Sequence, residues 1–193
     1  SFLSGIFGMA GGLILLGVLL FYLDVAPAMV LLGVIQAGSN LSRVAFWREH
    51  ILWHIVFPFV VGAVACFAVM RLVSFVPSKP VLYLCLGLTP IIVDNLPKSL
   101  SLDITRPRMP YICGVVIMFL QFVAGVAGSV LDLFFQQSKL GRMAIVGTKA
   151  ATQVVGHVFR IAYFGSFSDA FDVGLPWWVY AAAIGLAIAG TAL

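Results

Sequence analysis

Charged residues are scarce in this sequence: Asp, Glu, Lys and Arg together make up 9% of its 193 residues. A soluble domain carries about 25% charged residues, so this composition excludes an ordinary water-soluble globule. The mean hydropathy of +1.13 also excludes intrinsic disorder, which requires low hydropathy and high charge. What remains is an all-α polytopic membrane protein, because lipid offers no hydrogen-bond partner to an unpaired backbone amide.

Cysteine is also scarce, with Cys66, Cys85 and Cys113 lying in apolar runs. They have no metal-ligand spacing and form no even disulfide framework, so we interpret them as small core residues and expect neither metal nor cofactor. The N-terminal apolar run lacks a preceding basic region, which argues against a cleaved signal peptide. The chain begins and ends inside apolar stretches, which predicts that it belongs to something longer.

Apolar runs of about 20 residues, the length that a membrane-spanning helix needs, occur along the whole chain. The longest polar connection divides it into a first repeat (1–97), a central connection (98–110) and a second repeat (111–193) whose C-terminus is predicted to be incomplete. Thr89-Pro90 in the fourth run favours a kinked or re-entrant helix. The predicted spans are 2–23, 27–47, 51–73, 80–97, 110–135, 142–164 and 175–193.

An internal repeat emerges when the sequence is aligned with itself at an offset of 117 residues. Apolar residues often align by chance in membrane proteins. A glutamine pair and an arginine pair that align at the same offset, seven residues apart along the chain, do not. We therefore predict two repeated multi-helix halves, an arrangement common in transporters. The segments and residues in register are Gly8–Gly11 with Gly125–Gly128, Gln36 with Gln153, and Arg43 with Arg160.

Loop charge indicates how the halves are related. The first loop of the first half holds only Asp24, whereas its counterpart holds Lys139 and Arg142; the second loop holds Arg48, whereas its counterpart holds two aspartates. Basic loops stay cytoplasmic, so this pattern favours inverted repeats. Four spans in each half would instead make the repeats parallel, because an even number returns the chain to the same side of the membrane. A fourth segment that is re-entrant, and so does not cross, would reconcile the span count with the loop charges. We therefore expect broken or re-entrant helices.

Small residues cluster at equivalent points of the first span and of its counterpart. Such clusters serve close helix packing in membranes, or they mark a break in each helix that frees backbone N–H groups for an anion. Both interpretations stay open. The candidate anion-binding residues in these clusters are Gly8, Gly11 and Gly12 in the first half and Gly128 and Ser129 in the second.

Polar side chains line one face of the sixth predicted span and of the matching second span, at helical spacing. A cation at the bilayer centre costs at least about 2.5–3.5 kcal/mol, so such a face turns toward the bundle interior or a cavity. The alternative is a structural network, and the two arginines could also extend to the interface from the ends of their spans. We expect these residues to bind a substrate anion, with Lys149 and Arg160 supplying charge: they are Gln36, Asn40 and Arg43 in the first half, and Lys149, Gln153, His157 and Arg160 in the second.

Asp132 is the one carboxylate well inside a predicted span of these repeats. Cations outnumber it, so a cavity here would be electropositive and would suit an anion. Asp132 either forms an ion pair with Lys149 or exchanges protons to couple transport. His157 either titrates near neutral pH or stays neutral and hydrogen-bonded.

Three segments resemble the sulfite exporter TauE/SafE family, and Thr148-Lys149-Ala150 followed by Gln153 and His157 is the most specific part. The resemblance implies a multi-pass transporter of the inner (plasma) membrane, in two four-helix halves. It implies export of sulfite, an organosulfonate or a related small sulfur-containing anion, with Thr148 among the binding residues. The segments are 4–12 (SGIFGMAGG), 125–135 (GVAGSVLDLFF) and 146–165 (VGTKAATQVVGHVFRIAYFG).

Other functions find less support in the sequence. An anion channel and a non-transporting membrane subunit remain as alternatives. There is no nucleophile elbow and no phosphate loop, and Ser39 with His157 is too unspecific to indicate a hydrolase, so we do not expect an enzyme. The expected partners are the small anion, the lipid bilayer and a second copy of the chain in a homodimer, but not a nucleic acid.

Overall fold

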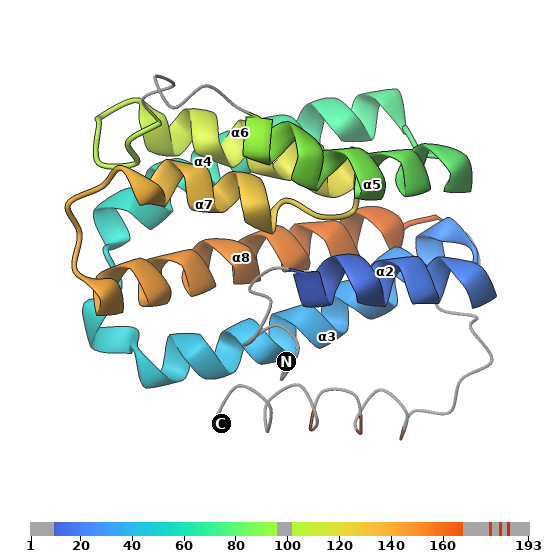
Figure 1. Cartoon of the computed structure of the whole chain (residues 1–193), viewed down its shortest axis with the longest axis horizontal. Helices are drawn as coiled ribbons and strands as arrows, with labels where there is room; N and C mark the ends of the chain where they lie inside the picture. Colours follow the sequence, from blue (N-terminus) through green and yellow to red (C-terminus); the bar gives the residue numbers. More distant parts are fainter. Residues whose placement is uncertain (1–9, 96–101, 168–177, 179–181, 183–184, 186–193) are drawn as a thin grey trace.

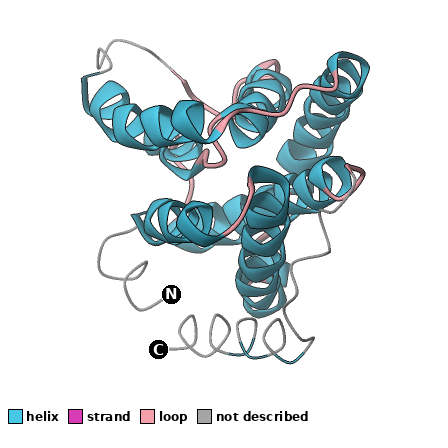
Figure 2. Cartoon of the chain, turned by 90° about the vertical axis from the view of Figure 1, so that its right-hand side faces the viewer, coloured by secondary structure: helices cyan, strands magenta, loops and turns pink. Residues whose placement is uncertain are grey.

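The computed structural model describes residues 10–95, 102–167, 178, 182 and 185, and within them the chain is all-α. The described helices lie side by side along one long direction, and no strand interrupts them in this part of the chain (Figures 1 and 2). A 3₁₀ turn, η1 (Arg48–His50), joins two of them. The helices are α2 (Ala10–Tyr22), α3 (Val25–Phe46), α4 (Trp53–Val73), α5 (Lys79–Asn95), α6 (Met109–Val123), α7 (Gly128–Gln136) and α8 (Arg142–Phe164).

Two of the described helices, α3 and α4, are long and apolar enough to cross a membrane. Helix α8 has 23 residues, but its polar residues keep it out of that class. The fourth predicted span is α5, which is continuous through Thr89-Pro90 rather than broken there; Thr89 Oγ1 donates to the carbonyl of Cys85 at 2.6 Å. The predicted span 175–193 falls almost entirely outside the described residues.

The fifth predicted span, expected as one helix over 110–135, is two helices. Helix α6 ends at Val123 and α7 begins at Gly128. Between them Gly125 has a φ of +72°, a left-handed conformation that glycine adopts without steric cost. The break expected at the second glycine cluster is therefore present.

The equivalent break in the first half was expected at Gly8–Gly12. The described part of this segment is helical instead. Gly11 and Gly12 are helical in α2, and Gly8 lies outside the described residues. A run of small residues is compatible with a continuous helix when it serves packing, and Gly12 does so: a Cβ there would lie 2.5 Å from the side-chain amide nitrogen of Gln36.

Two helix pairs organise the core: α3 packs on α8, and α4 packs on α6. In the first pair, a Cβ at Gly33 would lie 3.6 Å from Arg160 Nε, and one at Gly147 would lie 3.2 Å from Trp47 Cβ. These two contacts fix α3 and α8 as antiparallel neighbours. The polar faces predicted on the two helices therefore share one long interface.

The α4–α6 pair depends on two glycines that let the backbones touch. A Cβ at Gly62 would strike the carbonyl oxygen of Tyr111, and a Cβ at Gly114 would strike that of Phe59. Close approach through small residues is the common mode of helix packing in membranes. This packing positions α6, and through it the break that leads into α7.

Replacing Gly114 by alanine should destabilise the protein by about 1–3 kcal/mol, the usual cost of overpacking a core. The added methyl group meets backbone atoms of α4, which cannot rotate away as a side chain can. Thermal unfolding in detergent, followed by circular dichroism, measures the effect. Gly87→Ala is the matched control, because a Cβ at Gly87 meets nothing within 4 Å; equal unfolding midpoints for the two variants would contradict this account.

Candidate functional site

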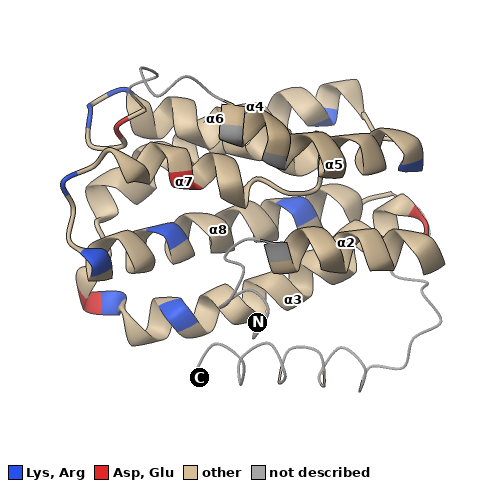
Figure 3. Cartoon of the chain, viewed as in Figure 1, with Lys and Arg blue, Asp and Glu red and all other residues tan. Residues whose placement is uncertain are grey.

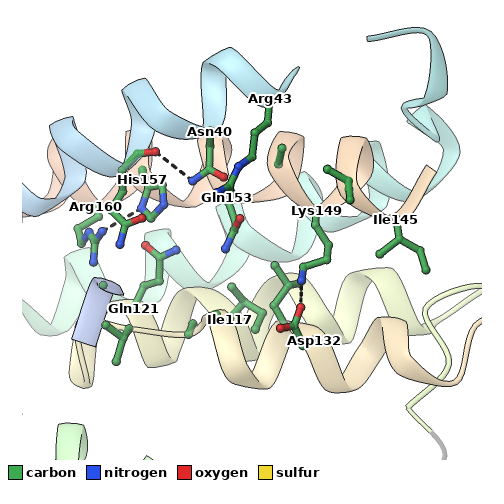
Figure 4. A pocket seen from close by; sticks show the side chains of 18 of the residues that line it. Asn40, Arg43, Ile117, Gln121, Asp132, Ile145, Lys149, Gln153, His157 and Arg160 are labelled. Atoms are coloured by element: carbon green, nitrogen blue, oxygen red, sulfur yellow. Dashed lines mark hydrogen bonds and ion pairs between the residues drawn. The ribbon is translucent and has the colours of Figure 1, made fainter. Parts of the chain in front are cut away.

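A cavity of about 520 Å³ lies between α3, α8 and the broken α6–α7 segment (Figure 4). Its volume is in the range of small-molecule sites, about 300–1,000 Å³. All seven candidate residues of the two predicted polar faces line it, as do two of the clustered glycines. The predicted residues that line the cavity are Gly12, Gln36, Asn40, Arg43, Gly128, Asp132, Lys149, Gln153, His157 and Arg160.

Three described candidates do not line the cavity: Gly11, Ser129 and Thr148. Thr148 is fully buried, and its Oγ1 accepts a hydrogen bond from the backbone N–H of Leu52 at 3.0 Å. Leu52 is the N-cap of α4, so Thr148 provides a hydrogen-bond acceptor for a backbone N–H at the N-terminus of α4. Adjacent residues of a helix point about 100° apart, which is why Thr148 and Lys149 face different surroundings.

Arg160 forms the deep end of the cavity and is only 1% exposed. Its Nη1 donates to the carbonyl of Gly125, inside the break between α6 and α7, and its Nη2 lies 2.9 Å from His157 Nδ1. A guanidinium only donates hydrogen bonds, so Nδ1 must be the accepting nitrogen. His157 is therefore neutral, and its proton lies on Nε2.

Four buried side-chain atoms, all on residues that line the cavity, have no hydrogen-bond partner among the described residues: Asn40 Oδ1, Gln121 Oε1, His157 Nε2 and Arg160 Nε. The orientation of the Asn40 amide is fixed, because its nitrogen donates to the carbonyl of Gln36 at 3.0 Å. Buried polar groups are nearly always paired in native proteins. An unpaired set around one cavity indicates a site for a polar ligand.

The shallow end of the cavity contains an ion pair between Lys149 on α8 and Asp132 on α7 (Figure 4). Both side chains are 23% exposed. Arg142, an exposed residue at the start of α8, also lines the cavity. The cavity therefore extends from the buried Arg160 to the end of the molecule where α8 begins.

The lining is electropositive. Cations lie on α3 and α8, and a carboxylate lies opposite on α7 (Figure 3). Asp132, the one carboxylate in the described lining, is already paired with Lys149. Arg43 and Arg160 form no ion pair with any described carboxylate. The cations left without a carboxylate partner give the cavity a net positive charge.

The start of α7 adds backbone donors at the same cavity. Val126, Ala127 and Gly128 line it, and the N-cap residue Ala127 has no side-chain cap. The bond from the N–H of Leu131 to the carbonyl of Ala127, at 2.9 Å, is the first of the helix, so the N–H groups before it lack helical partners. Such a helix start favours negative charge.

Sequence reasoning missed Gln121 and did not assign Arg142 to the site. Gln121 is 3% exposed, and its amide nitrogen is 2.5 Å from where a Cβ at Gly156 would lie. A signal for it existed, since it is the one amide side chain within the apolar helix Met109–Val123, which contains no charged residue. The equivalent position of the first half holds Ser4 rather than a glutamine. The repeat therefore did not identify Gln121 as a candidate.

No protein-family model matches the chain, and no curated protein or solved structure matches it either.

Proposed function

We propose that this chain is a secondary membrane transporter, acting as an exporter, of sulfite, an organosulfonate or a related small oxyanion that binds in the cavity between α3, α6–α7 and α8. The observation that carries the proposal is a net positive lining combined with two buried donors, His157 Nε2–H and Arg160 Nε–H, that have no acceptor within the described ranges. The resemblance to the TauE/SafE family supplies the substrate class.

A location in a membrane draws support from the apolar surface of α4. Trp53, Phe57, Val61 and Leu72 are 49%, 64%, 58% and 87% exposed. Their spacing places them along one side of the helix. Soluble monomers rarely expose a contiguous apolar surface of this extent, whereas lipid covers it without cost. We propose the inner membrane, with several spans.

The ends of the molecule support inverted repeats. The α2–α3 connection and the α7–α8 connection lie at opposite ends (Figure 1), although the two are equivalent in the repeat. Basic residues gather at the end with the α7–α8 connection (Figure 3), whereas the other end holds an ion pair between Lys79 and Asp24 at 3.1 Å. By the positive-inside rule we propose that the basic end is cytoplasmic.

Sulfite uptake into proteoliposomes tests the proposal. We expect saturable flux of radiolabelled sulfite, and we expect Arg43→Gln to lower the apparent affinity about tenfold, since one unpaired cation leaves the cavity lining. Arg71→Gln is the matched control, because Arg71 is exposed, bonds Ser166 Oγ at 2.5 Å and does not line the cavity.

Each alternative function gives a different result in the same assay. Flux that rises linearly with sulfite concentration would favour an anion channel. Absence of flux together with absence of sulfite binding to the purified protein would favour a non-transporting subunit and overturn the proposal. Equal loss of affinity in the Arg43 and Arg71 variants would contradict the placement of the site.

A further inference from the structure

The atoms of the deep end that lack a hydrogen-bond partner in the described part of the chain are of two opposite kinds. His157 Nε2 and Arg160 Nε carry hydrogens and can only donate, because the contact of Arg160 with Nδ1 fixes the histidine tautomer. Asn40 Oδ1 can only accept, because the carbonyl of Gln36 holds the amide nitrogen. An anion without hydrogen satisfies the donors but leaves the Asn40 oxygen desolvated and unpaired, which is unfavourable in a buried site.

The helix register places these atoms near one another. Gly33 lies beside Arg160, and Gly147 lies beside Trp47. Asn40 is midway between Gly33 and Trp47 on α3, so it stands level with residues 153–154 of α8. That level is about one helical turn, or roughly 5.4 Å, from His157. Asn40 and His157 are 2% and 5% exposed, so both side chains belong to the buried part of the cavity.

We infer that the deep end of the cavity recognises an oxyanion that also carries a hydroxyl group: Arg160 and His157 donate to the anionic oxygens, and Asn40 Oδ1 accepts from the hydroxyl. This inference rests on the proposed function and narrows its substrate class. Gln121 Oε1, buried on the opposite wall and without a hydrogen-bond partner among the described residues, is an alternative acceptor for that single hydroxyl hydrogen.

A pair of sulfonates of nearly equal size tests the inference. Isethionate, which ends in a hydroxyl, and propane-1-sulfonate, which ends in a methyl, differ at the one group that Asn40 would recognise. We expect the full chain in nanodiscs to bind isethionate about tenfold more tightly, the usual effect of one well-placed hydrogen bond in a buried site. Nonspecific apolar binding would give the opposite order. Isothermal titration calorimetry measures both constants.

The variant Asn40→Leu removes the acceptor while keeping the size of the side chain. We expect it to weaken isethionate binding and to strengthen propane-1-sulfonate binding, because no oxygen is then left unpaired, so that the preference for isethionate disappears. Asn95→Leu is the matched control: Asn95 makes the same kind of bond, from its amide nitrogen to the carbonyl of Ile91 at 2.8 Å, but is exposed at the end of α5.

The outcomes separate this inference from the proposed function. Equal affinities for the two sulfonates in the unaltered protein would overturn the inference and leave the proposed function standing. A preference for isethionate that persists in Asn40→Leu would overturn the role of Asn40. If neither sulfonate nor sulfite binds, the proposed function itself fails. The comparison in the unaltered protein needs no variant, so it decides the matter even where Asn40→Leu does not fold.

Discussion

Replacing Lys149 by alanine is expected to abolish anion transport, and replacing Asp132 by alanine in the same chain is expected to restore most of it. Lys149 pairs with Asp132 in the cavity. Removing the lysine alone leaves a carboxylate uncompensated, which destabilises the protein by about 3 kcal/mol and repels the anion. Removing both leaves the net charge of the cavity unchanged, with Arg43, Arg142 and Arg160 still lining it.

A double-mutant cycle measures the coupling between Lys149 and Asp132. Sulfite flux and thermal unfolding are compared among the unaltered protein, the two single variants and the double variant. Asp132→Ala alone should bind the anion more tightly, because the site gains net positive charge. If the double variant folds but transports nothing, Lys149 contacts the substrate directly and does not serve to neutralise Asp132. The pairing in the structure favours neutralisation over the direct contact with substrate that the sequence led us to expect for Lys149.

Arg160→Lys is expected to weaken anion binding by about a hundredfold in a protein that still folds. Hydrogen bonds to charged groups contribute about 1.5–3 kcal/mol each, and lysine cannot reproduce the planar fork that bonds both Gly125 and His157. Without the contact to Nδ1, the proton on His157 is no longer fixed at Nε2. The site then loses a donor as well as the geometry of the guanidinium.

Nitrogen-15 NMR of the histidine ring gives this prediction a readout beyond affinity. We expect the Nε2–H tautomer of His157 in the unaltered protein and a mixture of tautomers in Arg160→Lys. Arg43→Lys is the matched control, since Arg43 lines the same cavity without contacting the ring. A single unchanged tautomer in both variants would contradict the assignment of Arg160 as the residue that positions His157.

The polar faces of α3 and α8 could be predicted from the sequence because helical spacing alone determines which side chains share a face. Gln36, Asn40, Gln153 and His157 all line the cavity for this reason. The break at Gly125 could be predicted less securely, since glycine is compatible with both a break and close packing. The structure has a break there, where Gly125 has a φ of +72° and where a Cβ would also strike Leu16 and Met29.

Other features depend on contacts that no local pattern encodes. Thr148 follows the family-like motif, yet its hydroxyl caps α4, a helix almost a hundred residues earlier in the chain. Gln121 lines the cavity because α6 packs on α4 through Gly62 and Gly114, which sets the rotation of α6. A single glutamine in an apolar helix indicates that it is buried in protein, but not which helix it faces.

The polarity of α8 has a consequence for how the chain is made. Arg142, Lys149 and Arg160 each oppose spontaneous transfer of an isolated helix from the translocon into lipid, by up to about 2.5–3.5 kcal/mol near its centre. The partners that Lys149 and Arg160 find outside α8 are Asp132 on α7 and the carbonyl of Gly125 in the break between α6 and α7, and both are synthesised earlier. For the membrane location proposed above, we therefore expect an ordered insertion, in which α6 and α7 already lie beside the translocon when α8 leaves it.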